Sequence, residues 1–440
     1  MRRFTAFLLA AAFAIGTAQA QVAAPVAPPP AAAFSPIVTI TAARPNGLYA
    51  VGETVRWTVR QPLGMPGARY TYEVRENNLA VLSSGALDLS SGMAVVEGSL
   101  SRPGIITLVL KPVDVPSVPP MAQAAISAAA AVGIRDIRPS APRPADFKSF
   151  WDGKLAQLRA IPINPRLTPV ESGRAGVTLN TVLLDSVGSQ VQGYLARPDR
   201  AGKFPALVIY QYAGVYALEK ETSVNRAAEG WLAFNVDSHD MPPTEASAPR
   251  NYASLGNSDR ETSYFLNMYL RDTRAIDFIR ANPDWDGKTI VIMGTSMGGQ
   301  QSFATAGLNP GVITAMLVNV PSGANIAGDL HGQRAGYPNW NSADPAVAAT
   351  APYFDTMSFA PDITAAAVVA PGLIDVTSPP YGIIAAFNQM KGPKELVPMV
   401  ESDHNHITPQ KQNAWLERSR AALEELRTTG RVTINANFDR

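Results

Sequence analysis

The chain has 440 residues, of which 46% are hydrophobic and 17% are charged, a globular composition with room for two or three domains. Its 37 Lys and Arg residues balance 36 Asp and Glu residues, which excludes the basic excess expected of a protein that binds nucleic acid or an anionic membrane surface. It has no cysteine, which excludes disulfides, thiolate zinc sites and a cysteine nucleophile.

The first twenty residues have the layout of an export signal. Arg2 and Arg3 form a short positive region, and Phe4 to Ile15 is an apolar stretch too short for a stable bilayer anchor. Ala18 and Ala20 then fit a small-x-small cleavage site. We therefore expect a signal peptide over residues 1–20 and an exported protein, periplasmic or secreted, with an uncleaved anchor as the alternative. No later apolar run is long enough to predict a membrane-spanning helix.

The next part of the chain predicts a linker and then a small β domain. Residues 21–36 are rich in Ala and Pro, which is typical of an extended linker. Residues 37–132 contain short runs of strand-forming residues separated by Gly, Pro and Asn turns, at 37–40, 54–59, 70–74 and 105–110. This punctuation predicts an Ig-like β-sandwich. We expect it to be a spacer or packing partner, with a carbohydrate-binding module as the more specific alternative.

Residues 140–428 alternate between strand-like and helix-like segments and predict a catalytic domain. Strands are expected near 178–185, 190–196, 206–210, 231–236, 288–293, 313–320, 365–370 and 395–400. Helices are expected near 146–159, 219–229, 260–281, 297–306, 380–390 and 409–428. Such alternation predicts an α/β fold, with a mostly parallel sheet covered by helices on both faces. Ligands of these sheets bind at the carboxyl ends of the strands.

The strongest motif lies at one of these strand ends. The apolar run 290–293 stops at Gly294, and Ser296 follows within the pattern G-x-S-x-G before a helix-like segment. The two glycines leave room where the backbones of a sharp turn pass too close for a side chain. A chance Gly/Ser turn is the alternative, but the strand before the serine and the helix after it favour a nucleophile.

Two later strand ends offer the groups that a serine nucleophile needs. Asp375 follows the strand 365–370 as a candidate orienting acid, with Asp362 and Asp403 as weaker alternatives. His404 follows the last strand as the candidate base, and His406 competes for this role. The order Ser, Asp, His is that of an α/β-hydrolase. Metal binding by the His-x-His pair ranks low, because no carboxylate cluster completes a site.

An oxyanion formed at Ser296 needs two N–H donors. One should be the backbone N–H of Met297, and the other should come from the loop after the strand 206–210, from Tyr212 or Ala213.

These residues, with residues 144–151 (PADFKSFW), 269–278 (YLRDTRAIDF), 294–299 (GTSMGG) and 372–375 (GLID), resemble the acetylxylan esterase/cephalosporin-C deacetylase family of α/β-hydrolases. The resemblance covers residues of about 140–425. It implies a serine esterase that removes short acyl groups, usually acetate, from sugars. By matching position it implies Ser296 as nucleophile, Asp375 as acid and His404 as base.

The sequence departs from the family pattern at three places near the site. Met297 replaces the usual Gln after the nucleophile, the family's Arg-Gly-Gln segment is replaced near 237–241, and its His-Glu pair is replaced at 404–406. The three triad positions survive these departures, but the substrate that the family implies does not carry over intact. The candidates for substrate contacts are His239, Asp240, Tyr216, Tyr337 and Trp340, each of which has ordering or packing as the alternative role.

The sequence thus predicts an exported serine esterase that hydrolyses short-chain, acetyl-type esters, expected to be those of carbohydrates, without a cofactor or metal. Its partner is a small-molecule or carbohydrate ester, with no nucleic acid, and the oligomeric state stays open. The alternatives are a peptidase related to prolyl oligopeptidases and a non-catalytic binding protein on a hydrolase scaffold. A region of about 95 residues without repeats of blade length is too short for the propeller that usually accompanies such peptidases.

Overall fold

The structure is a computed structural model that describes residues 38–61, 69–114, 126–404 and 409–436. The expected signal peptide and linker lie outside the described residues. The described residues belong to one compact unit. None of the helices in the described ranges is both long and apolar enough to cross a bilayer.

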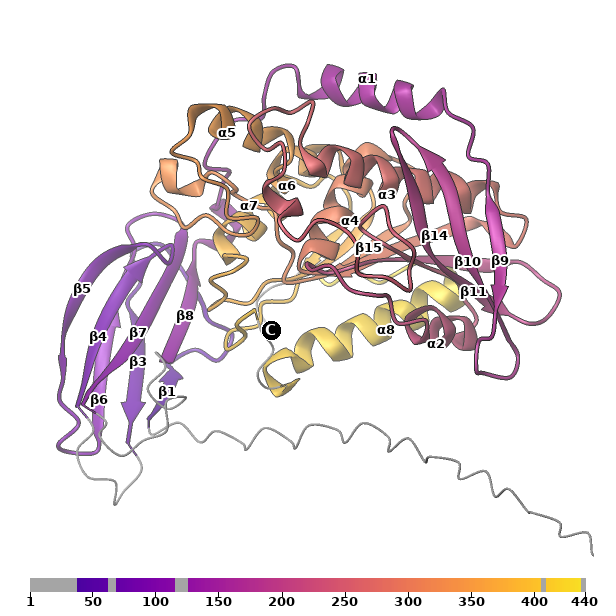
Figure 1. Ribbon diagram of the computed structural model, residues 1–440. Helices are drawn as coiled ribbons and strands as arrows, with labels where there is room; N and C mark the ends of the chain where they lie inside the picture. Colours follow the sequence, from indigo (N-terminus) through magenta and orange to yellow (C-terminus); the bar gives the residue numbers. More distant parts are fainter. Residues whose placement is uncertain (1–37, 62–68, 115–125, 405–408, 437–440) are drawn as a thin grey trace, which may run out of the picture. The chain divides into compact units, whose positions relative to one another are not determined.

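The chain begins with a β-rich region of two sheets packed around one core (Figure 1). The smaller sheet has the order β1-β3-β6, from β1 (Thr39–Ala42), β3 (Val55–Arg60) and β6 (Met93–Gly98). The larger sheet has the order β2-β8-β7-β4-β5, from β2 (Leu48–Tyr49), β8 (Ile126–Val132), β7 (Gly104–Asp114), β4 (Arg69–Glu76) and β5 (Ala80–Leu87). All pairs are antiparallel except β2 with β8. Trp57 of the smaller sheet and Leu108 of the larger one are fully buried in the shared core.

Strand β8 is buried on both of its faces. Ala130 and Val132 belong to the core of the β-rich region, whereas Ala129 and Ala131 belong to the main core of the following α/β part. Successive side chains of a strand point to opposite faces, so β8 joins the two cores. Alanine favours helices in isolation, but here its small side chain lets two packed layers approach a single strand.

The remainder of the chain builds one sheet of nine strands, in the order β17-β16-β15-β14-β12-β13-β11-β10-β9. The six strands from β17 to β13 in this order run parallel, and β11, β10 and β9 complete the sheet in antiparallel fashion. The bounds are β9 (Arg166–Val170), β10 (Val177–Ser186), β11 (Ser189–Pro198), β12 (Phe204–Tyr210), β13 (Leu232–Val236), β14 (Trp285–Thr295), β15 (Ala315–Asn319), β16 (Ala366–Ala370) and β17 (Lys394–Leu396).

Helices cover both faces of this sheet (Figure 1). Alternate residues of β12 show the division, because Val208 packs in the core that α3, α4 and α7 share, while Leu207 packs under α8. The α-helices are α1 (Phe147–Arg159), α2 (Glu221–Glu229), α3 (Tyr264–Ala281), α4 (Met297–Leu308), α5 (Pro345–Thr350), α6 (Thr356–Phe359), α7 (Pro380–Gln389) and α8 (Asn413–Thr429). Short 3-10 turns are η2 (Ile134–Asp136), η3 (Tyr252–Ser254), η4 (Gly328–His331), η5 (Ala351–Tyr353), η6 (Ala360–Asp362) and η7 (Pro409–Gln412).

This architecture confirms the predicted α/β-hydrolase fold behind a small β-sandwich. The main difference in the catalytic part is the last strand, which was expected at 395–400 and is found as Lys394–Leu396. Pro398 has no N–H for a ladder, so the chain beyond Leu396 keeps only single bonds to its neighbour, such as that of the Val397 N–H to the Val369 carbonyl (2.8 Å). The edge strand β9, all of whose residues are exposed, has no apolar alternation that would have predicted it.

Candidate active site

Ser296 occupies a sharp turn between β14 and α4, with φ 56° and ψ −120°. A Cβ on Gly294 would lie 2.2 Å from the carbonyl carbon of Gly298, and a Cβ on Gly298 would lie 2.4 Å from the carbonyl oxygen of Tyr210. Neither position can hold a larger residue without moving backbone. The two glycines therefore let β12, β14 and α4 approach closely enough to project the serine from the sheet.

The structure brings Ser296, His404 and Asp375 into one hydrogen-bonded line. Ser296 Oγ lies 2.8 Å from His404 Nε2, and His404 Nδ1 lies 2.8 Å from Asp375 Oδ2. Because a carboxylate only accepts, Nδ1 carries a proton and Nε2 faces the hydroxyl as an acceptor. Asp375 is fully buried and Ser296 is 7% exposed. His406, the alternative base, lies outside the described residues.

The candidate acid, Asp375, lies in a loop whose backbone N–H groups bind its carboxylate. Asp375 Oδ1 accepts the N–H groups of Thr377 (2.8 Å) and Ser378 (2.7 Å) in an Asx-type turn. The loop begins after β16 and is tied to the segment before His404 by the N–H of Leu373, which donates to the Met399 carbonyl (3.0 Å). Asp375 and His404 thus approach the serine from two segments that are hydrogen-bonded to each other.

A second chain of hydroxyls approaches the serine from another direction. Ser322 Oγ lies 3.1 Å from Ser296 Oγ and 2.7 Å from Ser378 Oγ, and both of these neighbours are almost fully buried. Ser322 follows β15 through Val320, whose φ of 37° is unusual for a β-branched residue. The sequence interpretation missed Ser322 and Ser378. The available signal was a polar residue just past the carboxyl end of the strand next to the nucleophile strand.

The candidate oxyanion donors lie on two elements that are tethered together. Helix α4 begins at Met297, so the N–H of this residue belongs to the first turn, whose donors have no intrahelical acceptor. The loop after β12 is held to α4 by Gln301 Nε2, which donates to the carbonyls of Gln211 (2.9 Å) and Met297 (3.2 Å). Tyr212 and Ala213 follow directly in this loop, and the backbone N–H of one of them stays the predicted second donor.

His239, a candidate substrate contact, is fully buried and orders this same loop. Its Nε2 lies 2.9 Å from the Gly214 carbonyl and its Nδ1 lies 2.8 Å from the Tyr264 hydroxyl. Burial lowers the pKa of His239 to about 4, so the ring is neutral and donates from Nε2 to Gly214. The placement corrects the substrate-contact interpretation in favour of the ordering alternative. Asp240, in contrast, is exposed, and Gln192 Nε2 lies 3.4 Å from its Oδ1.

The three aromatic candidates differ in exposure. Tyr216 is half-buried and stacks on Tyr212, which is 56% exposed, with ring centroids 4.7 Å apart. Tyr337 is half-buried, and its hydroxyl lies 2.8 Å from that of Tyr252 and 3.3 Å from the sulfur of Met297. Trp340 is buried and donates its Nε1–H to the Ala253 carbonyl (2.6 Å), so it packs rather than faces a ligand.

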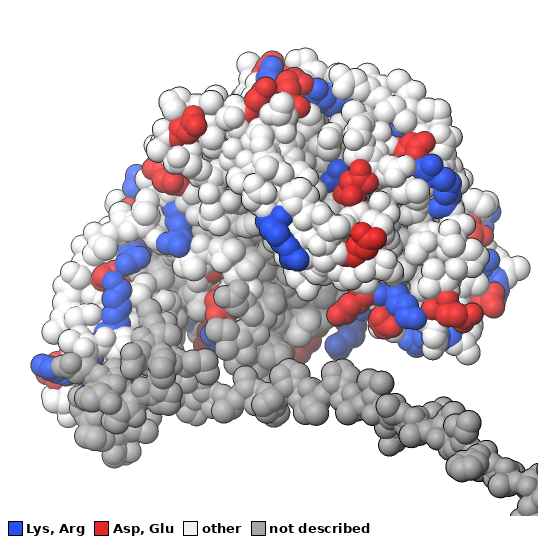
Figure 2. Space-filling model, in the orientation of Figure 1, with Lys and Arg blue, Asp and Glu red and all other residues white. Residues whose placement is uncertain are grey.

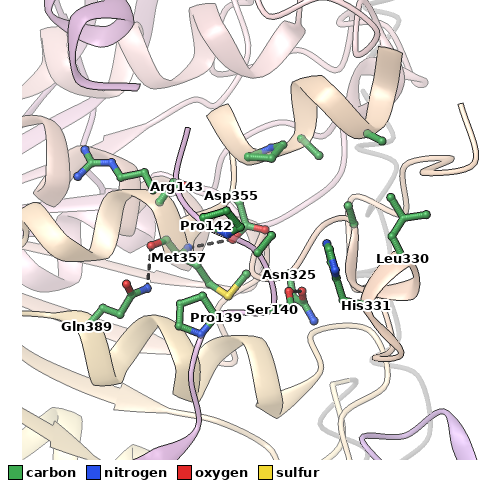
Figure 3. A pocket seen from close by; sticks show the side chains of 16 residues that line it. Pro139, Ser140, Pro142, Arg143, Asn325, Leu330, His331, Asp355, Met357 and Gln389 are labelled. Carbon is green, nitrogen blue, oxygen red and sulfur yellow. Dashed lines mark hydrogen bonds between the residues drawn. The ribbon is translucent and has the colours of Figure 1, made fainter. Parts of the chain in front are cut away.

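A cavity of about 390 Å³ lies apart from these residues (Figure 3). Its wall is formed by the segment 139–143, by residues of the segment 325–358 and by Gln389, and none of Ser296, Asp375 and His404 lines it. Asp355 in this wall accepts the N–H groups of Ile326 (2.8 Å) and Met357 (2.9 Å). Burial raises the pKa of Asp355 to about 6. Its carboxyl group therefore fixes backbone, capping α6, and the candidate chemistry stays at Ser296.

Known proteins resemble this chain in sequence and in fold. The family model described as acetyl xylan esterase (AXE1) matches residues 129–326 and 337–419. The acetyl esterase Axe7A of Xylanibacter ruminicola is 29% identical in an alignment of 395 positions that covers 84% of this chain and 88% of that protein. The acetyl xylan esterase of Paenibacillus sp. R4 matches with a TM-score of 0.56 and 25% identity over 64% of this chain and 96% of that chain.

Acetyl xylan esterase 1 of a Thermoanaerobacterium species, at 19% identity, shares the fold with a TM-score of 0.53, over 64% of this chain and 97% of that chain. The family model alone spans more than half of the sequence. The chain therefore belongs to the acetyl xylan esterase family of carboxylic-ester hydrolases.

Proposed function

We propose that this protein is a serine esterase that removes acetyl groups from carbohydrate esters, with Ser296, His404 and Asp375 as its catalytic triad. The observation that carries the proposal is the unbroken line from Ser296 Oγ to His404 Nε2 (2.8 Å) and from His404 Nδ1 to Asp375 Oδ2 (2.8 Å). A serine alone is a weak nucleophile, and this line supplies the base and the group that orients the base.

In the first half of the reaction Ser296 Oγ attacks the carbonyl carbon of the ester, and its proton passes to His404 Nε2. The carboxylate of Asp375 keeps the ring in the tautomer that can accept this proton and stabilises the imidazolium that forms. The N–H of Met297 and that of Tyr212 or Ala213 bind the oxyanion. The imidazolium then protonates the departing sugar oxygen as its bond to the carbonyl carbon breaks, so the sugar leaves as an alcohol and an acetyl ester remains on Ser296.

The second half releases acetate. A water molecule gives one proton to His404 and attacks the acetyl carbon on Ser296, and the same donors bind the second oxyanion. Ser296 leaves as the alcohol when it takes the proton back from His404. When the Ser296 hydroxyl donates to His404, Ser322 must be the donor in its own contact with Ser296 Oγ (3.1 Å), and this bond supports the oxygen when it carries partial negative charge in both halves.

The substrate class rests on the family and on the surface beside the site. Relatives that match the chain are named as acetyl esterase and acetyl xylan esterases. Tyr212, exposed and stacked on Tyr216 beside the oxyanion loop, offers a flat apolar ring of the kind on which a sugar can lie. On the face of the molecule drawn in Figure 2, acidic and basic side chains are interspersed.

The test compares the wild-type protein with Ser296→Ala on 4-nitrophenyl acetate and on acetylated xylo-oligosaccharides. We expect the variant to lose hydrolysis of both while its circular dichroism spectrum is unchanged, and we expect only the wild type to react with a fluorophosphonate probe. A peptide substrate is run in parallel. Cleavage of the peptide at a higher kcat/KM than that of the acetyl esters would favour a peptidase instead, and undiminished turnover by Ser296→Ala would remove the proposed mechanism.

Export is also part of the proposal, supported by the charge, length and Ala-x-Ala site of residues 1–20. Expression of the full chain in a bacterial host, followed by mass spectrometry of the mature N-terminus, tests it. A product beginning near Gln21 outside the cytoplasm is expected, and an intact N-terminus in the cytoplasmic fraction would contradict it.

A further inference from the structure

The first two residues of the turn between β4 and β5 are buried, although hairpin tips usually face solvent. Asn77 and Asn78 form this turn with φ of 50° and 57°, and each is only 5% exposed. Asparagine tolerates this left-handed backbone better than most residues. The turn is anchored in its own sheet, because the N–H of Asn77 donates to the Ile105 carbonyl (2.7 Å) and its Oδ1 accepts the Ile105 N–H (2.9 Å).

The side chain of Asn78 reaches from this turn to the candidate catalytic acid. Its Nδ2 donates to the backbone carbonyl of Asp375 (3.2 Å), and its Oδ1 accepts the hydroxyl of Thr107 on β7. A carbonyl oxygen can only accept, so this contact requires the amide nitrogen, and the Thr107 hydroxyl then donates to the amide oxygen. Both ends of the amide are thus used within buried surroundings, where such bonds are costly to lose.

A neighbouring arginine extends the same contact. The N–H of Arg334 donates to the Asn77 carbonyl (3.4 Å), and its Nε donates to the carbonyl of Val376 (3.0 Å). With the Asx turn of Asp375, successive peptide groups from Asp375 to Ser378 are all held. Rotation of the peptide after Asp375 would carry its carboxylate away from His404, and the Asn78 bond opposes that rotation.

The β-rich region touches the base segment as well. A Cβ on Gly47 would lie 3.1 Å from Val400, in the segment before His404, and 3.3 Å from Leu373, in the acid loop. Strand β8 joins the core of the region to that of the α/β part, so these contacts are backed by a rigid layer. Trp57, Tyr49 and Tyr70 are buried in the core of the region itself, and Tyr72 is partly buried against this core.

We infer that the N-terminal β-rich region is part of the catalytic framework and that Asn78 is a positioning residue for Asp375. This inference rests on the proposed function, because it takes Asp375 as the acid of the triad. Asn78 touches neither substrate nor a reacting atom. It acts by fixing the backbone from which the carboxylate reaches His404.

The test uses the full chain with Asn78→Asp and Asn78→Gly, which both keep the left-handed turn accessible. Asn78→Asp retains an acceptor for Thr107 but sets a carboxylate oxygen against the Asp375 carbonyl, while Asn78→Gly removes the side chain. We expect kcat on 4-nitrophenyl acetate to fall about 10- to 100-fold in both, because small misplacements of a catalytic group cost that much. KM should stay within about twofold, since the substrate contacts are untouched. Labelling by the fluorophosphonate should slow by the same factor as kcat.

Two controls separate positioning from general damage. Asn164→Asp makes the same change at another left-handed asparagine, whose Nδ2 binds Asp185 (2.8 Å) outside the acid loop, and should leave kcat unchanged. Val96→Ala cuts into the core of the β-rich region and should lower the Tm with kcat preserved while the protein is folded. Wild-type kcat in both Asn78 variants would overturn the inference, as would an equal loss of kcat in folded Val96→Ala.

Ser296→Ala is measured in the same assay. If it stays active, the proposed function fails. If it is inactive while both Asn78 variants turn over like the wild type, only the inference about the β-rich region fails.

Discussion

The hydroxyl of Ser322 lies 3.1 Å from the hydroxyl oxygen of Ser296 and links it to the loop of Asp375 by a second route. Ser322 Oγ is 2.7 Å from Ser378 Oγ, and the N–H of Ser378 donates to Asp375 Oδ1 (2.7 Å). Together with His404 these groups close a ring of hydrogen bonds around the nucleophile. If the Ser296 hydroxyl donates its proton to His404, its oxygen must accept a hydrogen bond from the Ser322 hydroxyl. Ser378 must then donate to Ser322, so the donor of each hydrogen bond in the ring is fixed.

The first prediction follows from this ring. Ser322→Ala removes the donor to Ser296 Oγ and should lower kcat about 2- to 10-fold, the worth of one buried hydrogen bond of roughly 0.5–1.5 kcal/mol. KM should change little, because the substrate does not depend on this bond. Steady-state kinetics on 4-nitrophenyl acetate measure both.

A matched control is Ser223→Ala, which removes a fully buried hydroxyl from α2, where it bonds the Tyr194 carbonyl (2.9 Å). It should reduce the free energy of unfolding by about 1 kcal/mol and leave kcat unchanged. If Ser322→Ala matched wild-type kcat, or if Ser223→Ala lost as much, Ser322 would be an ordinary buried hydroxyl.

The second prediction concerns the acid. Asp375→Asn replaces an acceptor that orients His404 by an amide that can also donate, which favours the wrong tautomer. We expect kcat to fall by about three to four orders of magnitude with KM near its wild-type value. Asp362→Asn is the comparison, because Asp362 was an alternative acid and is instead paired with Arg143. A loss in Asp362→Asn as large as that in Asp375→Asn would argue against the assignment.

The alternation of strand-like and helix-like segments was enough to predict the fold and to place three strand ends close together. Ser296, Asp375 and His404 each follow a run of apolar residues, and such runs align in a parallel sheet. The catalytic roles of these residues stay predictions until the variants are measured.

What the pattern did not predict are contacts across layers. No sequence motif marks Ser322, because its contact with Ser296 depends on the backbone turn at Val320. His239 lies at the carboxyl end of the sheet, as predicted, but its side chain is fully buried and contacts the Gly214 carbonyl. Asn78 lies about 300 residues before Asp375 in the sequence, and no local periodicity connects a hairpin turn with an acid loop.

The third prediction tests the glycines of the nucleophile turn. Gly298→Ala would place a Cβ 2.4 Å from the Tyr210 carbonyl oxygen and should abolish activity or soluble expression. Gly153→Ala is the matched change in the exposed part of α1, where a Cβ meets nothing within 4 Å. It should raise stability by about 0.5–1 kcal/mol and leave kcat alone. Thermal unfolding and the acetate assay measure both, and an active, stable Gly298→Ala protein would contradict the steric account.

The last prediction concerns acid stability and two buried groups with opposite effects. Burial lowers the pKa of His239 from 6.5 to about 4. Between these two pH values the histidine is mostly protonated in the unfolded chain and mostly neutral in the folded protein. The contribution of His239 to the free energy of unfolding is therefore greatest above pH 6.5 and decreases as the pH falls toward 4. Burial raises the pKa of Asp237 from 3.8 to about 7, so its effect has the opposite sign, and stability falls as the pH rises through that window.

His239→Gln isolates the first of these effects, because Asp237 is present in both proteins and its contribution cancels in the difference. Glutamine can still donate to the Gly214 carbonyl but does not titrate. The free energy of unfolding of the variant therefore does not include the decrease that His239 causes at low pH in the wild type. The free energy of unfolding of the wild type, minus that of the variant, should therefore decrease by about 3 kcal/mol between pH 7 and pH 4. Urea unfolding at half-unit pH steps measures the difference, and His331→Gln, at an exposed histidine, is the control. A difference for His239→Gln that stays constant across this range would mean that His239 takes up a proton in the folded protein as readily as in the unfolded chain.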